Sequence, residues 1–330
     1  MILKNILVTG GAGYIGAHMT RVLLENGYAP TVLDNLSTGY REFVPPHVAF
    51  IQADLKDARV VAEVFSTHRF DAVIHFAGSI VVSESVMQPE KYHRNNVEAS
   101  ECLLNEMMRR HIGYFIFSST AAVYGEAKQV PVTEEAPLMP QSPYAETKVL
   151  VEKMLQERFG PAGLKFMALR YFNVCGSHPD ADIGIKMDNP THLIPNVMRA
   201  ANGRKPYLDI FGDDYPTKDG TCIRDYVYVM DLCRGHLAAL NALAKGVPSD
   251  IINLGSGSGF SVKEIIMAAE RVTGHPVPVK ISPRRGGDMP QVVASYKKAE
   301  RLLGWTPQTP LDAILETAWK WEKALTEKNW

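Results

Sequence analysis

The sequence predicts a doubly wound α/β fold, in which helices cover both faces of a parallel sheet, with a smaller, interleaved α/β lobe. Short apolar segments alternate with longer helical segments through the first half of the chain. The apolar segments are continuous rather than alternating, as is expected of strands buried on both faces. A glycine-rich turn also joins the first apolar segment to the first helical segment.

The expected elements follow from this rhythm. Six segments are expected to be strands: Ile6–Val8, Thr31–Leu33, Val48–Ile51, Ala72–Phe76, Phe115–Phe117 and Phe166–Leu169. The expected helices are His18–Asn26, Pro89–Arg110, Pro143–Arg158, Thr191–Asn202 and Val229–Leu243, and a later strand is Ile251–Asn253. After about Cys175 the chain becomes rich in Pro, Gly and Asp. We therefore expect residues 1–175, with 225–260 returning to them, to form the larger domain, and 176–224 and 261–330 to form the smaller lobe.

Composition limits the possible functions. The chain has 330 residues, of which 46% are hydrophobic and 22% charged, and its formal net charge is −1. Such a balance is ordinary for a globular protein and provides no overall attraction to nucleic acid or membrane. The four cysteines are scattered without a C-x-x-C pair, so neither a metal site nor a disulfide framework is expected. The N-terminal segment lacks a signal-peptide pattern and no apolar run is long enough to span a membrane, so we expect a cytoplasmic protein.

The segment Gly10-Gly11-Ala12-Gly13-Tyr14-Ile15-Gly16 lies between the first expected strand and the first expected helix. Glycines at positions 10, 13 and 16 let the backbone turn sharply and approach a pyrophosphate closely. The N-terminus of the helix then offers free N–H groups and partial positive charge to the phosphates. A glycine motif alone is a weak signal, but its position between a strand and a helix makes it a strong one.

Asp34 ends the second expected strand, where an acidic residue of a dinucleotide-binding fold holds the adenosine ribose. A carboxylate there accepts both ribose hydroxyls and repels a 2′-phosphate, and Asn35 rather than an arginine follows it. NAD is therefore favoured over NADP. Asp54, after the third strand, is expected either to cap a helix or to accept a hydrogen bond from the adenine amino group.

Ser142-Pro143-Tyr144 has the pattern of a helix start, and Tyr144 and Lys148 then lie one turn apart on one face. We expect the lysine ammonium, together with a positive nicotinamide ring, to lower the pKa of the tyrosine so that it can act as a base. A Y-x-x-x-K pair is common by chance. Here, however, Ser118-Ser119-Thr120 also follows a strand at the carboxyl end of the predicted sheet.

These motifs resemble the extended short-chain dehydrogenase/reductase family in order and spacing, across essentially the whole chain: Thr9 to Gly16, Ser118-Ser119-Thr120 and Tyr144-x-x-x-Lys148. The resemblance implies a Rossmann-type sheet and a catalytic triad of Thr120, Tyr144 and Lys148. Further segments are similar to UDP-glucose 4-epimerases: Ile74–Gly78, Arg94–Val97, Arg170–Asn173, Ile210–Gly212, Arg224–Tyr226 and Pro283–Asp288.

By this similarity an NAD site and a UDP-sugar site are implied. The NAD site comprises Gly10, Gly13, Tyr14, Ile15, Gly16, Asp34, Asn35, Asp54, Leu55, Phe76, Ala77, Gly78, Asn95, Ser118, Tyr144, Lys148, Tyr171 and Phe172. The UDP-sugar site comprises Thr120, Tyr144, Asn173, Leu193, Phe211, Arg224, Arg285, Asp288 and Val292. Arg224 and Arg285 suit a pyrophosphate because a guanidinium binds it bidentately.

The sequence departs from the family pattern at three positions. Ile80 replaces a lysine near the cofactor phosphates, and Thr120 replaces a serine. Val292 replaces a bulky tyrosine of sugar-restrictive relatives. A smaller side chain there is expected to admit N-acetylated sugars.

The implied activity is 4-epimerisation of UDP-hexoses through a transient 4-keto sugar, with a UDP-pentose 4-epimerase as the alternative. A nucleotide-sugar dehydratase or a UDP-glucuronate decarboxylase needs an acid where this chain has Ala121 and Ala122, which cannot donate a proton. A non-catalytic NAD sensor typically loses the Tyr144/Lys148 pair, which is intact. The resemblance also implies a homodimer formed through Pro89–Arg110 and Pro143–Arg158, although their apolar residues equally fit an ordinary core.

Overall fold

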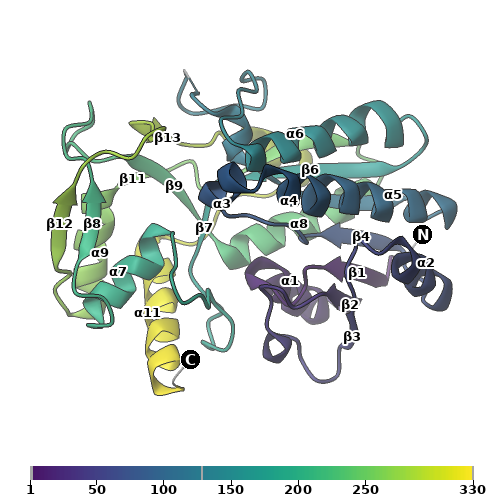
Figure 1. Cartoon of the computed structure of the whole chain (residues 1–330), viewed down its shortest axis with the longest axis horizontal. Coiled ribbons are helices and arrows are strands. Elements are labelled where there is room, and N and C mark those ends of the chain that lie inside the picture. The colour runs from purple at the N-terminus through teal and green to yellow at the C-terminus, as the bar shows by residue number, and fades with distance from the viewer. Residues whose placement is uncertain (1–2, 128, 329–330) are drawn as a thin grey trace.

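The computed structural model describes residues 3–127 and 129–328. Figure 1 shows one large sheet with helices on both of its faces, and two small sheets beside it. The large sheet has seven parallel strands, in the order β3 (Ala49–Gln52), β2 (Ala29–Asp34), β1 (Asn5–Thr9), β4 (Ala72–His75), β5 (Tyr114–Thr120), β6 (Lys165–Tyr171) and β10 (Asp250–Leu254). The seven strands predicted from sequence are all present in this sheet, which confirms the predicted fold class.

The register of the sheet aligns the carboxyl ends of its central strands. Thr9 of β1 lies opposite Leu33 of β2 on one side and His75 of β4 on the other. The strand order reverses between β1 and β4, and ligands of open α/β sheets bind outside the carboxyl ends at such a point.

Each face of the sheet has its own apolar core because successive strand residues point to opposite faces. Ile6 and Val8 belong to a core shared with α1 (Tyr14–Glu25) and α8 (Val229–Ala244). Leu7 belongs to the core on the other face, which is shared with α2 (Ala58–Thr67), α5 (Ala99–Arg109) and α6 (Pro143–Met154). None of these strand residues is exposed, which explains why the strand segments are continuously apolar.

The small sheets lie to the left in Figure 1, together with α7 (Leu193–Ala201), α9 (Val262–Thr273) and α11 (Leu311–Glu327). One contains β7 (Asn173–Cys175), β9 (Ile223–Tyr228), β11 (Gly259–Ser261) and β13 (Gln291–Val292), and the other pairs β8 (Leu208–Phe211) with β12 (Val279–Ser282). The remaining helices are α3 (Val82–Met87), α4 (Pro89–Tyr92) and α10 (Lys297–Leu303), with 3₁₀ turns at Arg41–Phe43 and Ala121–Tyr124.

Several predicted element boundaries were wrong. The first helix begins at Tyr14 rather than His18, because Gly13 is its N-cap and the glycine turn ends there. The segment predicted as one helix over 89–110 consists of α4, a π-helical segment at His93–Glu98 and α5, and α6 likewise ends in a π-helical segment at Leu155–Phe159. Such bulges are frequent at functional sites, and the first one carries Asn95.

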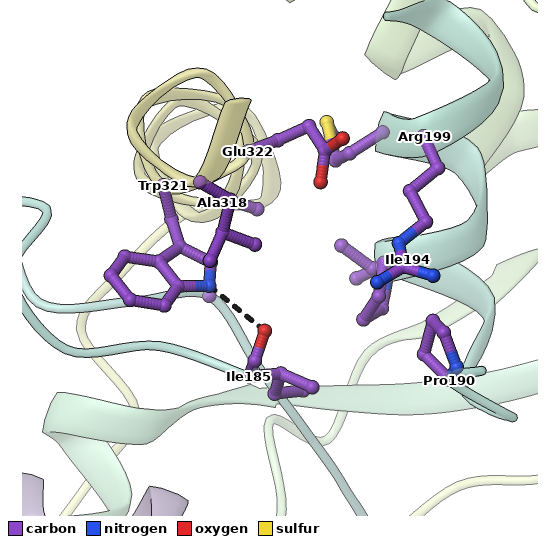
Figure 2. A pocket seen from close by; sticks show the side chains of 11 residues that line it. Ile185, Pro190, Ile194, Arg199, Ala318, Trp321 and Glu322 are labelled. Carbon is purple, nitrogen blue, oxygen red and sulfur yellow. Dashed lines mark hydrogen bonds between the residues drawn. The ribbon is translucent and has the colours of Figure 1, made fainter. Parts of the chain in front are cut away.

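A small pocket lies between α7 and α11, lined by Ile194, Arg199, Trp321 and Glu322 among others (Figure 2). The indole Nε1 of Trp321 donates a hydrogen bond to the carbonyl of Ile185, at 2.9 Å. None of the predicted site residues lines this pocket. Within the described ranges, no helix is both long and apolar enough to cross a membrane.

Candidate active site

The glycine turn has the close backbone packing that a dinucleotide site needs. Gly10 has a φ of +68°, and a Cβ there would lie 2.6 Å from the backbone nitrogen of Ala77. A Cβ on Gly16 would lie 2.2 Å from the carbonyl oxygen of Gly10. The N-cap of α1 has no side-chain hydrogen bond and its first turn has no acidic residue, so the positive end of the helix is available to an anion. This cradle fits a pyrophosphate.

The acidic residues expected at the adenosine end lie beside this turn. The Asp34 carboxylate accepts hydrogen bonds from the backbone nitrogens of Ala12 (3.0 Å) and Leu36 (2.8 Å), and burial raises its pKa. Asn35 donates to Asp54 at 3.1 Å. Asp54 does not cap a helix, because the side chain that caps α2 is Asp57. The capping alternative for Asp54 was therefore wrong.

The end of β4 and the π-helical segment meet around Ser79. Asn95 donates to the Ser79 hydroxyl at 3.0 Å. Asn96 accepts from the Ser79 backbone nitrogen at 2.7 Å and donates to its carbonyl at 3.0 Å. A Cβ on Gly78 would lie 3.8 Å from the ammonium nitrogen of Lys148. The segment after β4 is thus held against the helix that carries Tyr144 and Lys148.

The proposed triad comes together at the carboxyl edge of the large sheet. Thr120 is the last residue of β5, and Ser142 caps α6 so that Tyr144 lies in its first turn. The ammonium of Lys148 donates to the Ser118 carbonyl at 2.8 Å, and it lies 4.9 Å from the centre of the Phe117 ring. The three side chains therefore share one locus, as the motif spacing indicates.

Burial and hydrogen bonding set the pKa values of the triad residues in the absence of NAD. Burial raises the pKa of Tyr144, and the hydrogen bond between the Thr120 and Tyr144 side chains acts to lower it. The Lys148 ammonium lies 6.0 Å from the centre of the Tyr144 ring and donates to the Ser118 carbonyl, and the lowering of the Tyr144 pKa by Lys148 and nicotinamide together stays a prediction. Burial also lowers the pKa of Lys148 to about 8, and Glu152 acts in the opposite direction.

Four residues predicted for the UDP-sugar site form one cluster on the small sheets. The Asp288 carboxylate accepts from Arg224 Nη2 at 3.3 Å and from Arg285 Nε at 2.9 Å. Arg285 also stacks over the Phe211 ring, at 4.7 Å from its centre. The two guanidinium groups are thereby held near each other, where they can share one polyanion.

Asp225 was missed in the sequence, although it follows Arg224 directly. It is buried and accepts hydrogen bonds from the backbone nitrogen and hydroxyl of Ser256 (2.7 Å each), from Gly257 N (2.9 Å) and from Ala294 N (3.0 Å). Its own carbonyl accepts from the Asn173 amide at 2.9 Å. Asp225 thus joins β9 to the segment at Ser256 and Gly257 and to the chain just beyond Val292.

The remaining predicted residues lie on the same elements. Val292 is half-buried and packs on a cluster that includes Phe172 and Val149, and it lies opposite Arg224 in the β9–β13 pairing. Tyr14 donates to the Gly176 carbonyl at 2.6 Å, and Leu193 opens α7. Tyr171 ends β6 opposite Thr120, Ile15 follows Tyr14 in α1, and Leu55 is buried in the α2-side core.

Among the described residues, no cluster of His, Cys, Asp or Glu could hold a metal ion.

A model of the NAD dependent epimerase/dehydratase family matches residues 6–255, and the chain belongs to this family. A UDP-glucose 4-epimerase of Halalkalibacterium halodurans is 47% identical over 319 residues, which cover 96% of this chain and 95% of the relative. The structure is also similar to two solved structures. The UDP-glucose 4-epimerase of Brucella ovis in complex with NAD is 43% identical with a TM-score of 0.93, and 96% of this chain and 97% of that one are covered.

The second is the UDP-Glc/GlcNAc 4-epimerase of Campylobacter jejuni, which is 41% identical with a TM-score of 0.85 over 97% of this chain and 99% of that one. These likenesses confirm the resemblance to UDP-glucose 4-epimerases that the motifs carry.

Proposed function

We propose that this protein interconverts UDP-hexoses at C4, UDP-glucose and UDP-galactose above all, with NAD as a resident cofactor. The observation that carries the proposal is the meeting of Thr120, Tyr144 and Lys148 at the carboxyl edge of the sheet. The family and the epimerase relatives support the same reaction.

The cradle around Gly10 and Gly16 and the N-terminus of α1 would hold the NAD pyrophosphate. Asp34 would hold the adenosine ribose and Lys148 the nicotinamide ribose. When bound, NAD accepts the hydride from C4 of the sugar and returns it. Ile80 is 54% exposed and brings no charge to the phosphates, so the backbone and helix dipole supply most of the anion binding.

The protein groups handle the proton. Tyr144, as a phenolate, takes the proton of the sugar 4-hydroxyl, and the Thr120 hydroxyl bonds the same oxygen. Because burial raises the pKa of Tyr144, its deprotonation depends on nearby positive charge, which the Lys148 ammonium and a nicotinamide cation together would provide. The resulting 4-keto sugar rotates within the site and accepts the hydride back on its opposite face.

The sugar must be free to turn, so binding energy has to come from the UDP end. Arg224 and Arg285, oriented by Asp288, would clamp the pyrophosphate, and Phe211, Leu193 and Asn173 would surround the rest of the nucleotide. The division of the chain into an NAD-binding domain and a UDP-sugar lobe stays a prediction. We propose that the large sheet binds NAD and the small sheets bind UDP.

The reaction is tested by incubating the purified protein with UDP-galactose alone, stopping the reaction, and then measuring UDP-glucose in the stopped mixture with a separate dehydrogenase assay. In the incubation itself, conversion to an equilibrium mixture is expected without added oxidant or net NADH. A protein that binds NAD but converts neither sugar would contradict the proposal, as would release of a 4-keto-6-deoxy product.

We further propose that N-acetylated UDP-hexoses are substrates. Val292 packs beside Phe172, and a tyrosine there would fill space that an acetamido group needs, in a protein interior that tolerates little extra volume. The likeness to the Campylobacter jejuni UDP-Glc/GlcNAc 4-epimerase supports this scope. Wild type should show comparable kcat/KM for UDP-N-acetylglucosamine and UDP-glucose, and Val292→Tyr should selectively lose the former. Rejection of the N-acetyl sugar by wild type would refute the pocket argument.

A cytoplasmic homodimer is our proposal for the assembly. The outer surface of α5 and α6 carries Met108 and Met154, both half-buried, and Leu150, which is 40% exposed. Arg158 joins this surface by pairing with Glu101 and Asn105. The chemistry of this surface suits a second copy of itself, and Leu150→Glu should convert a dimer to a monomer in light scattering. A wild-type protein that is monomeric at micromolar concentration would refute the assembly.

A further inference from the structure

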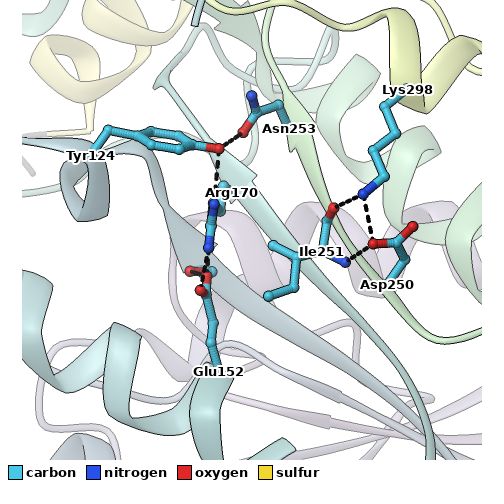
Figure 3. Close-up of polar contacts among 8 residues, drawn as sticks. Tyr124, Glu152, Arg170, Asp250, Ile251, Asn253 and Lys298 are labelled. Atoms are coloured by element: carbon cyan, nitrogen blue, oxygen red, sulfur yellow. Dashed lines mark hydrogen bonds and ion pairs between the residues drawn. The ribbon is translucent and has the colours of Figure 1, made fainter. Parts of the chain in front are cut away.

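A buried ion pair lies behind the triad. Glu152 of α6 and Arg170 of β6 have side chains only 1% and 4% exposed. Arg170 donates through Nε to Glu152 Oε1 at 2.9 Å and through Nη2 to Oε2 at 2.6 Å, and Oε1 also accepts from the Ser119 hydroxyl. Figure 3 shows Glu152, Arg170 and Tyr124 in one line across the strands. No motif in the sequence links these two residues.

The network continues to the far side of the site. Arg170 Nη1 donates to the Tyr124 hydroxyl at 3.0 Å, and that hydroxyl donates to Asn253 Oδ1 at 2.6 Å. Asn253 in turn donates to the Val132 carbonyl at 3.1 Å. The Val132 backbone nitrogen donates to the Val293 carbonyl at 2.8 Å. Hydrogen bonds therefore connect α6 to the residue that follows Val292.

The position of Glu152 relates it to the proposed catalytic groups. Tyr144, Lys148 and Glu152 occupy successive turns of one face of α6, since they are four residues apart. Ser119, whose hydroxyl donates to Glu152, lies between Ser118, which binds Lys148, and Thr120, which is itself a member of the triad. The Ser118 carbonyl accepts from Lys148, and Thr120 bonds Tyr144. One carboxylate thus fixes β5 at the point where both contacts are made.

Stability does not account for such a pair. Desolvating two charges costs about as much as their attraction returns, and a well-packed apolar pair is often as stable or more so. Both carboxylate oxygens of Glu152 are instead hydrogen-bonded, one to the Ser119 hydroxyl and to Arg170 Nε and the other to Arg170 Nη2, and these bonds fix the orientation of the carboxylate. A carboxylate held in this way can in turn hold Ser119, and with it the end of β5, in one orientation.

We infer that Glu152 is a positioning residue for the epimerase reaction: it sets β5 against α6 through Ser119, and Arg170 holds its negative charge in place on the face of α6 that carries Lys148. The inference rests on the proposed roles of Thr120, Tyr144 and Lys148.

In the absence of bound NAD, the other titratable groups around Lys148 are held in their neutral forms. His75 on β4 is buried, which lowers its pKa to about 3, and the nearby lysine acts in the same direction. Burial raises the pKa of Tyr171 on β6 and of Tyr144 on α6, and it also raises that of Tyr92 on α4. In the described part of the chain, the Glu152 carboxylate acts on the pKa of Lys148 in the direction opposite to burial.

Four variants of the NAD-loaded enzyme separate charge from structure: Glu152→Gln, Arg170→Met, the double variant and Ser119→Ala. For each we would measure kcat and KM against pH, NAD content and the free energy of unfolding. Glu152→Gln should lower kcat by about 10- to 100-fold with little change in KM. It should also move the basic limb of the kcat profile down by about one pH unit, because Lys148 then loses its proton earlier.

The other variants have different expected signatures. Arg170→Met should not move the basic limb downward, because the Glu152 charge remains, whereas the double variant should move it downward as Glu152→Gln does, because both remove that charge. Ser119→Ala should lower kcat several-fold without moving the limb, and it keeps the test valid if the charge variants fold poorly. A wild-type kcat in Ser119→Ala would overturn the positioning role. A basic limb that stays in place in Glu152→Gln, or shifts alike in all variants, would overturn the electrostatic role.

Tyr144→Phe and Lys148→Met, measured alongside, distinguish a failure of the proposed catalytic roles from a failure of the inference about Glu152. If either retains most of its activity, the proposed catalytic roles fail. If both are inactive while Glu152→Gln has the rate and pH profile of wild type, only the inference about Glu152 fails.

Discussion

Asp225→Asn tests whether one buried carboxylate holds the UDP-sugar side of the site together. The asparagine keeps the shape of the side chain but replaces one acceptor oxygen by an NH₂ group. If that group faces Gly257 and Ala294, two backbone N–H groups lose their acceptor. If it faces Ser256, the hydroxyl can rotate to accept and only the backbone nitrogen is left without a partner. The second orientation costs less and should be adopted.

The loss then equals one hydrogen bond to a charged group, about 1.5–3 kcal/mol. The free energy of unfolding, measured in urea at fixed protein concentration, should fall by this amount. KM for UDP-galactose should rise because β9 and the chain beyond Val292 lose a common anchor. Asp312→Asn is the matched control: it breaks an ion pair with Arg271 whose side chains are 47% and 60% exposed, and it should cost less than about 1 kcal/mol. Equal effects of the two variants would refute the reasoning.

Three further outcomes are expected. Tyr144→Phe should lower kcat on the order of 10²–10⁴-fold while folding and NAD content stay unchanged; substantial residual turnover would remove Tyr144 from the mechanism. Denatured wild-type protein should release NAD, and Gly10→Ala should release none because the new Cβ meets Ala77 N at 2.6 Å, whereas a Cβ on Gly113 meets nothing within 4 Å and Gly113→Ala should retain it. His236 is fully buried, which lowers its pKa to about 4, so the unfolded chain takes up a proton below about pH 6.5 that the folded chain does not. Between pH 7.5 and 5.5 wild type should therefore lose about 1.4 kcal/mol more stability than His236→Phe; equal losses in urea titrations would contradict this.

The sheet was predictable because its signals are local. Each central strand is buried on both faces, so residues such as Leu7 and Val73 had to be apolar whatever their partners. The glycine turn and the Tyr144/Lys148 spacing are likewise local, since each depends on one turn or one helix. Helix boundaries were less accurate, because the π-helical segment at His93–Glu98 is accompanied by hydrogen bonds that Asn95 and Asn96 donate to Ser79, which lies in a different segment.

The groups that the sequence missed depend on contacts across long separations. Asp225 binds Ala294 across 69 positions, and nothing in the residues around Asp225 indicates that partner. The expected lowering of the Tyr144 pKa also needs a bound nicotinamide and stays a prediction. Helical spacing places Lys148 on the same face, but it could not show that the ammonium is bound to the Ser118 carbonyl.

An epimerase that returns hydride to the opposite face of its sugar needs a fixed base and a permissive pocket in one site. The structure supplies these from different kinds of interaction. The base side is constrained by buried charge and hydrogen bonds, with Glu152, Arg170 and Ser119 behind Thr120 and Tyr144. The wall at Val292 is apolar and makes no side-chain hydrogen bond that would hold a sugar in one orientation. The proposed base can therefore be held rigidly while the proposed sugar pocket lets the sugar rotate, because different residues form the two parts of the site.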